Sequence, residues 1–292
     1  MKSQTKAKRF LRRTFLACLA CTLALGAILG VKYTGAWWAG GHRFCTLAAA
    51  SRLPQDMPEF FRASAEALAE MAPEPDNWKK ALAPHLRAAE QPEHFIDLEH
   101  LEGRPMFRDR YDLLKYYYFK NADPAKAGFL PNAILESYER LLLAFHDCRQ
   151  HPHDHILQQR LIVYAGWLAH YCQDAGMPLH TSKFYDGRPG ANGQVEQAGI
   201  HAKIDAYPQK YLTPAAIAEG LAAEASADVW PVITRAVNES HKYVDQCYEL
   251  DKQGAFNETA PEKGRALMLE RARASAKLTL DLWYSAWKNS AD

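Results

Sequence analysis

The sequence lacks the patterns that predict a β-sheet. Runs of alternating β-branched residues are missing, and we identify no Asn-Gly or Asp-Gly hairpin flanked by strands. No repeat of fixed period and no low-complexity segment is visible. Apolar residues instead recur at the three- and four-residue spacing of helices, in 42–53, 56–71, 130–147, 155–175, 214–250 and 261–288. We therefore predict a single multi-helix domain of the all-α class.

Acidic residues are absent from the first 36 positions, which carry seven lysines and arginines. The rest of the chain then has 28 basic and 34 acidic residues, so the formal net charge of +1 hides a body of about −6. A protein that binds nucleic acid by neutralising phosphates with its side chains is usually basic. Any phosphate binding by this body must therefore use something other than side-chain charge, and metal ions would supply it.

Residues 1–36 are typical of an export signal. Six positive charges precede an apolar run from Thr14 to Val31, and Thr34-Gly35-Ala36 places small residues at a cleavage site. The run of about 18 residues is also long enough to remain as a membrane anchor. We predict a signal peptide at 1–36, or an uncleaved anchor, followed by a domain at 37–292 that is periplasmic or secreted.

Four cysteines remain in the predicted exported domain. In an oxidising compartment they could form two disulfides, in three possible pairings between which the sequence does not choose. They are Cys45, Cys148, Cys172 and Cys247.

Histidines and aspartates recur at a spacing that suits a metal site. His170 and Asp174 are four residues apart on a predicted helix, so both side chains leave the same face. His180 follows the end of that helix, and a second pair with the same spacing, His201 and Asp205, comes after a glycine-rich loop. A neutral imidazole and a carboxylate brought to one point make a good zinc site.

Simpler interpretations exist for each of these residues alone. One His/Asp pair at this spacing is usually a surface salt bridge, and a lone histidine on an apolar helix is usually a core residue with a satisfied hydrogen bond. Two such pairs, together with His180 and with His94 in apolar surroundings, favour a metal site over coincidence. A polar cluster around Asp154 is instead interpreted as a solvated loop, and it contains His151, His153 and His155.

Nine positions follow one another in a recognisable order: Trp37-Trp-Ala-Gly-Gly-His42, Asp76, His94-Phe-Ile-Asp97, His170-x3-Asp174-x3-Pro178-Leu-His180 and His201-x3-Asp205. In order and chemistry they resemble the zinc-dependent nuclease and phospholipase C family, which includes fungal single-strand nucleases and bacterial zinc phospholipases C. The resemblance runs from Trp37 to Asp205, and the segment after about 210 matches only as helices.

The resemblance implies three zinc ions per chain. Trp37, as the first residue of the cleaved chain, and His42 would bind one zinc and share Asp174 with a second. The second zinc would also take Asp76, His94 and His170, whereas the third would take His180, His201 and Asp205. Asp76 lies in a segment that departs from the family pattern, so Asp56 or Glu74 are alternatives for its role.

The resemblance also implies a phosphodiesterase mechanism in which zinc-activated water attacks phosphorus, with Asp76 and Asp174 as the catalytic carboxylates. We expect a nuclease acting on single-stranded nucleic acid, with Phe95 stacking a base and Asp97 bonding its edge. The short spacing from Trp37 to His42 favours that branch. One alternative is a phospholipase C acting on phospholipid head groups, and another is a membrane-anchored, non-catalytic zinc-binding protein. No stable protein partner is implied, and we expect a monomer.

Overall fold

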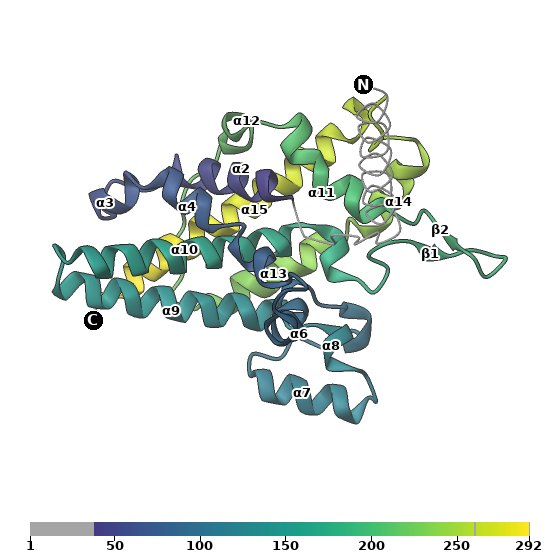
Figure 1. The fold of residues 1–292 in the computed structure, drawn as a ribbon, viewed down its shortest axis with the longest axis horizontal. Helices are drawn as coiled ribbons and strands as arrows, with labels where there is room; N and C mark the ends of the chain where they lie inside the picture. Colours follow the sequence, from purple (N-terminus) through teal and green to yellow (C-terminus); the bar gives the residue numbers. More distant parts are fainter. Residues whose placement is uncertain (1–37, 260, 292) are drawn as a thin grey trace, which may run out of the picture. The chain divides into compact units, whose positions relative to one another are not determined.

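The structure is a computed structural model, and it describes residues 38–259 and 261–291 (Figure 1). All of these belong to the unit Gly35–Asp292. Trp37 and the predicted export signal lie outside the described residues, so both remain predictions.

Helices make up most of the described chain, as the sequence predicts. The first half contains α2 (Ala39–Ala50), α3 (Glu59–Arg62), α4 (Ala65–Met71), α5 (Glu74–Trp78), α6 (Pro84–Glu90), η1 (Gln91–His94), η2 (Leu98–Leu101), α7 (Arg110–Phe119) and α8 (Pro124–Ala127). The second half contains α9 (Leu130–Gln150), α10 (His155–Gly176), η3 (Pro178–Thr181), β1 (Arg188–Pro189), β2 (Val195–Glu196), α11 (Ile200–Tyr211), α12 (Pro214–Ala218), α13 (Trp230–His241), α14 (Val244–Lys252) and α15 (Glu262–Asn289). The all-α prediction is confirmed.

The long helices α9, α10 and α15 form the centre of this unit, with α10 packed against both of the others (Figure 1). Asp154 caps α10 by accepting hydrogen bonds from the backbone N–H groups of Ile156 and Leu157. Trp283 of α15 is fully buried, and its indole N–H donates to the carbonyl of Ala165 on α10. These contacts fix α10 along its length.

Two glycines allow α10 to approach its neighbours closely. A Cβ atom at Gly166 would collide with Met71, at the end of α4, and one at Gly176 would collide with Ser275 on α15. Neither position tolerates a methyl group without movement of the helix. The segment of α10 between these glycines carries the predicted site residues 170 and 174.

Two local predictions are wrong. The range 214–250 is three helices, because 219–229 leaves the helical conformation at Gly220, which has a φ of +74°. A short hairpin also exists: β1 and β2 pair antiparallel, with Arg188 opposite Glu196, around a turn that contains Asn192 and Gly193. Strands of two residues are too short to give an alternating sequence pattern.

The four cysteines of the described chain are buried and unpaired, so the disulfides that the sequence allows are not formed. Burial raises the pKa of both Cys45 and Cys247 to about 12, which keeps these thiols protonated. Cys172, between the two predicted ligands of α10, is fully buried as well. Among the helices of residues 38–291, leaving out 260, none has the length and hydropathy that a membrane crossing needs.

Candidate metal centre

The end of α10 brings two predicted ligands to one face. His170 and Asp174 are both fully buried, and His170 Nε2 lies 3.3 Å from Asp174 Oδ2. The helix ends at Gly176, and η3 then turns the chain back so that His180 Nδ1 lies 3.9 Å from Asp174 Oδ1. Asp174 is therefore at the centre of the site.

Three elements from the first half of the chain complete this part of the site. His42 Nε2, from α2, lies 3.7 Å from Asp174 Oδ1, whereas His94 Nδ1, from η1, lies 2.9 Å from Asp174 Oδ2. Asp76 Oδ1, from α5, is 3.8 Å from His170 Nε2 and 3.9 Å from His94 Nδ1. The two carboxylate oxygens of Asp174 thus face different histidines, which is the arrangement that a carboxylate bridging two metal ions requires.

A third group forms where α11 meets η3. His201 Nε2 lies 2.9 Å from Asp205 Oδ2 and 3.3 Å from His180 Nε2, and all three side chains are buried. Two nitrogens bound to one tetrahedral zinc ion at 2.0–2.1 Å would be about 3.3 Å apart. The spacing of the two imidazoles therefore fits a shared zinc ion. We refer below to the eight residues of these groups as the His/Asp cluster: His42, Asp76, His94, His170, Asp174, His180, His201 and Asp205.

Hydrogen bonds to the outer ring nitrogens hold three of the imidazoles in place. His170 Nδ1 donates to the carbonyl of Ala72 at 2.8 Å, and His180 Nδ1 donates to the carbonyl of His94 at 2.6 Å. His42 Nδ1 donates to Gln173 Oε1 at 2.8 Å. In each ring the proton is then on Nδ1, so Nε2 keeps a lone pair that points into the cluster.

Burial sets the protonation of the histidines. It lowers the pKa of His42 and of His170 to about 4, and it lowers the pKa of His94 and His180 well below the ordinary value. Neutral imidazoles are the form that binds metal. His201 differs: burial alone would lower its pKa, but the adjacent Asp205 carboxylate outweighs burial and raises it.

The carboxylates of the cluster are poorly compensated by the chain itself. Burial raises the pKa of Asp174 well above its ordinary value, and it also raises the pKa of Asp205. Burial would do the same to Asp76, but the Lys79 ammonium 2.6 Å away outweighs it and lowers the pKa of Asp76. Asp174 Oδ1, Asp205 Oδ1 and His42 Nε2 are buried without a hydrogen-bond partner. Buried donors and acceptors rarely stay unpaired, so these atoms fit the coordination of a divalent cation.

Asp56 and Glu74, the alternatives to Asp76, form contacts outside the cluster. Asp56 accepts hydrogen bonds from Tyr284 and Lys288, and Glu74 accepts them from Asn77 and Trp78. Asp76 is the carboxylate that the structure brings to His94 and His170.

Trp37 lies outside the described residues, but the position of the next residue, Trp38, is known. The backbone N–H of Trp38 donates to the carbonyl of Asp205 at 3.2 Å. The described chain therefore begins beside the third group of the cluster. A ligand supplied by Trp37 remains a prediction.

The predicted substrate residues follow His94 closely in the chain. Phe95 is partly buried and packs against the backbone at Gly128. Asp97 is buried, and this burial, together with the nearby Glu99 carboxylate, raises the pKa of Asp97 to about 7. By contrast, His151, His153 and His155 are exposed, as predicted for a solvated loop.

Three residues that contact the cluster were not predicted from the sequence: Lys79, Gln173 and Asp186. Gln173 joins His42 to Thr46, and Asp186 Oδ1 accepts the backbone N–H groups of Gly199 and His201. Lys79 stands three residues after Asp76 in a short helical segment, so its spacing was the one available signal.

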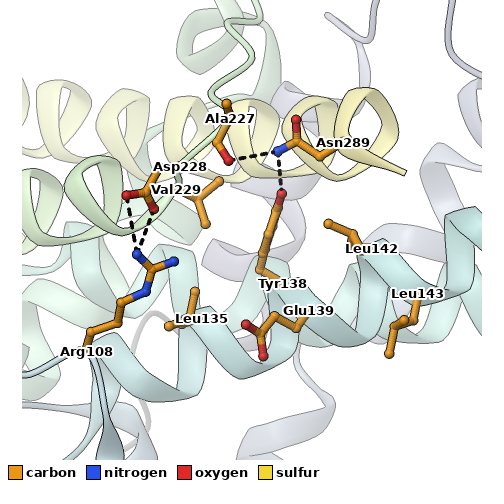
Figure 2. Close-up of a pocket in the computed structure, with 10 residues that line it drawn as sticks. All are labelled: Arg108, Leu135, Tyr138, Glu139, Leu142, Leu143, Ala227, Asp228, Val229 and Asn289. Carbon is orange, nitrogen blue, oxygen red and sulfur yellow. Dashed lines mark hydrogen bonds and ion pairs between the residues drawn. The ribbon is translucent and has the colours of Figure 1, made fainter. Parts of the chain in front are cut away.

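A cavity elsewhere in the unit differs from the His/Asp cluster in its lining residues. This cavity of about 390 Å³ lies between α9, α15 and residues 227–229 (Figure 2). Four of its polar residues are paired with each other: Arg108 with Asp228 at 3.2 Å, and Tyr138 with Asn289 at 2.8 Å (Figure 2). It has no histidine in its lining, so it does not provide the ligand set found in the His/Asp cluster.

Comparisons with known proteins do not assign a function to this chain. No family model and no curated protein matches the sequence. A similar solved structure is the alpha toxin from Clostridium absonum, with a TM-score of 0.44 and 13% sequence identity. The match covers 90% of this chain and 66% of the toxin chain, so this chain spans just under two thirds of that length.

Proposed function

We propose that this chain is a zinc-dependent phosphodiester hydrolase. The observation that carries the proposal is the His/Asp cluster, in which three groups of buried nitrogen and oxygen ligands share one site and Asp174 faces two of them. Neutral histidines and carboxylates are zinc ligands, and closely spaced zinc ions are typical of enzymes that displace groups at phosphorus.

Each group has its own set of ligands in this proposal. His42 and Asp174, with the amine of Trp37 after cleavage of the export signal, would hold one zinc ion. Asp76, His94, His170 and Asp174 would hold a second, and His180, His201 and Asp205 a third. Bound zinc would supply Lewis acidity and lower the pKa of water at the site.

The protein's own groups orient these ions. The hydrogen bonds from His170, His180 and His42 to their carbonyl and amide acceptors fix the rings before any metal arrives. Lys79 holds Asp76 in its ionised form, which suits a ligand or a base. Asp174 is fully buried, so its carboxylate would face bound metal ions rather than bulk water.

Single-stranded nucleic acid is the substrate that we propose. Phe95 and Asp97 lie within three residues of His94, so a base placed there would meet a ring and a carboxyl group next to the metal. Base stacking on an aromatic ring requires an unpaired base. A duplex should therefore be cut more slowly than a single strand.

A phospholipase C is the second candidate, and a separate surface favours it. Tyr111 and Tyr118 are each 70% exposed and Phe119 is 83% exposed, all on α7, while Leu82 is 95% exposed just before α6. Tyr111 and Tyr118 also line a cavity of about 430 Å³. Exposed aromatic and aliphatic side chains of this kind are typical of proteins that dock on membranes.

Metal content and the N-terminal residue test the proposed centre. Elemental analysis of the purified exported protein should give close to three zinc ions per chain, and its first residue should be Trp37. One zinc or fewer after full metal loading would rule out a trinuclear centre. An intact segment before Trp37 would remove the amine ligand and favour a membrane-anchored zinc-binding protein.

Parallel assays decide the substrate. Single-stranded DNA, duplex DNA and phosphatidylcholine vesicles should be offered to the same zinc-loaded protein. We expect rapid release of nucleotides from the single strand, slower release from the duplex and little diacylglycerol. Diacylglycerol without nucleotides would assign the chain to the phospholipase branch.

A further inference from the structure

We propose that Tyr185 is the second base-stacking platform of this site, beside the zinc group of His180, His201 and Asp205. This inference rests on the proposed nuclease function and extends it, since it assigns a base-binding residue to the group of His180, His201 and Asp205. The ligand it recognises is a nucleobase adjoining the scissile phosphate.

Position is the first argument. The Tyr185 side chain is 49% exposed, yet its ring centroid lies 5.8 Å from that of His201, with the two planes at 87°. The Tyr185 ring thus contacts a predicted zinc ligand, while about half of the side chain remains open to solvent. A base that stacks on this ring would lie next to the third metal position.

The loop around Tyr185 is held from both sides. Tyr248 donates its hydroxyl hydrogen to the carbonyl of Phe184 at 2.7 Å and accepts the backbone N–H of Gly187 at 2.9 Å. Asp186 Oδ1 accepts the backbone N–H of Gly199 at 2.7 Å and that of His201 at 3.3 Å. The residues before and after Tyr185 are therefore fixed by side chains of α14 and by the start of α11.

An exposed ring on a loop that is held in this way is suited to recognition. A tyrosine that served only packing would bury its ring, as Tyr117 and Tyr248 do in this chain. Binding to a ring that is already held loses little conformational entropy. Stacking on aromatic side chains is also how single strands are bound with little dependence on sequence.

The neighbouring charge fits a phosphate-bearing ligand. Lys183 is exposed two residues before Tyr185, and its backbone N–H is bonded to Glu99 Oε2 at 3.1 Å. An aromatic ring with a nearby cation is the combination used to bind single-stranded nucleic acid.

Tyr185 and Phe95 then stand at different groups of the same cluster. Phe95 follows His94, and Tyr185 contacts His201. The carbonyl of His94 accepts the hydrogen bond from His180 Nδ1, so the two groups are joined through one short contact. A phosphodiester held between them would have a base on each side, with one aromatic ring for each.

The experiment uses dinucleotides with a single cleavable linkage. Three substrates are compared on the zinc-loaded protein: the complete dinucleotide, and two versions that lack the base on one side or on the other. The variants are Tyr185→Ala, Tyr185→Phe, which keeps the ring, and Phe119→Ala, which removes an exposed aromatic from α7. Zinc content is measured for each.

We expect Tyr185→Ala to lower kcat/KM on the complete dinucleotide by about tenfold or more, mainly through KM. The same loss is expected on the abasic substrate that keeps the base stacked on Tyr185. The abasic substrate that lacks this base should be cleaved by Tyr185→Ala and by the wild type with the same kcat/KM. Tyr185→Phe and Phe119→Ala should match the wild type, and all variants should hold the same amount of zinc.

An equal loss on all three substrates, or a loss of zinc, would overturn the inference and give Tyr185 a purely structural role. An equal defect in Tyr185→Phe and Tyr185→Ala would overturn it as well, since the hydroxyl and not the ring would then matter. Failure of the wild type to cleave any dinucleotide would instead reject the proposed nuclease. Cleavage that is indifferent to Tyr185→Ala would reject the stacking role alone.

Discussion

Glu93 and His94 are consecutive residues that belong to two different polar clusters. Glu93 accepts two hydrogen bonds of 2.7 Å from Arg110, whose guanidinium also donates to Glu136 at 2.6 Å and 3.0 Å. This Glu93–Arg110–Glu136 network contains the cation that it needs. The His/Asp cluster on the other side has three buried or nearly buried carboxylates, and Lys79 is paired with only one of them.

The difference shows how a chain prepares for a ligand from outside. The His/Asp cluster buries its carboxylates, where an uncompensated charge costs several kcal/mol, whereas the Glu93–Arg110–Glu136 network is partly exposed. In the Glu93–Arg110–Glu136 network, an arginine of the chain itself supplies the positive charge. The other cluster places imidazole lone pairs opposite carboxylates, an arrangement that could hold a metal ion.

The largest expected effect comes from Asp174→Asn, which keeps the shape of the bridging side chain and removes its charge. We expect activity on single-stranded DNA to fall by roughly 10³-fold or more, equivalent to about 4 kcal/mol of transition-state stabilisation. Steady-state kinetics with the zinc-loaded variant would measure this. The exposed His153→Ala is the control and should change little; comparable losses at both positions would contradict the assigned site.

Zinc removal should lower the Tm of the protein through the His/Asp cluster and not through the Glu93–Arg110–Glu136 network. At a free zinc concentration 100 times the dissociation constant, a site contributes about 2.7 kcal/mol, which is roughly 5–10 °C in Tm for a chain of this size. Chelation should therefore lower the Tm of the wild type. The same treatment of Asp174→Asn should give a clearly smaller shift, and identical shifts would argue against zinc binding at this residue.

Arg110→Met should affect stability without affecting metal. The substitution leaves Glu93 and Glu136 facing each other without their cation, at a cost of about 2 kcal/mol in the free energy of unfolding, reduced by partial exposure. Urea denaturation and elemental analysis are the two measurements. A loss of zinc from this variant would mean that the network and the His/Asp cluster act as one unit.

Asp97→Asn tests the smallest effect, a pH dependence. The pKa of Asp97 is raised to about 7, so between its ordinary value and pH 7 the folded state keeps a proton that the unfolded state has lost. The stability contributed by this group therefore falls as pH rises through that window, by about 1 kcal/mol per pH unit. Comparing unfolding at pH 5 and pH 6, Asp97→Asn should lose less stability than the wild type. Parallel curves for the two proteins would show that Asp97 does not titrate there.

The sequence predicts the long helices well and the short connections poorly. Ranges 130–147, 155–175 and 261–288 correspond to α9, α10 and α15 within a few residues, because each has a continuous apolar face. Residues 219–229 carry similar apolar spacing but are not helical. Their backbone N–H groups at Glu224 and Ser226 bond instead to Asp281 and Ser285 of α15. Those partners are more than 50 residues away, and no local pattern reveals them.

The same limit applies to the site. The pairs His170/Asp174 and His201/Asp205 are predictable, because a helix places residues four apart on one face. Their convergence with His42 and His94 depends on tertiary packing, as do the contacts of Gln173 and Asp186. The order of these residues supports the family resemblance, whereas the distances between them come only from the fold.

Gly166 and Gly176 set the positional tolerance of the proposed metal centre. They let α10 rest directly on Met71 and Ser275, so the axial and lateral position of the helix is determined by hard contact at two points on either side of His170 and Asp174. An added methyl group at either point would displace the helix by a distance comparable to the margin within which a zinc ligand must be placed, about half an ångström. The accuracy of the coordination geometry thus depends on two residues that have no side chain and never touch the metal.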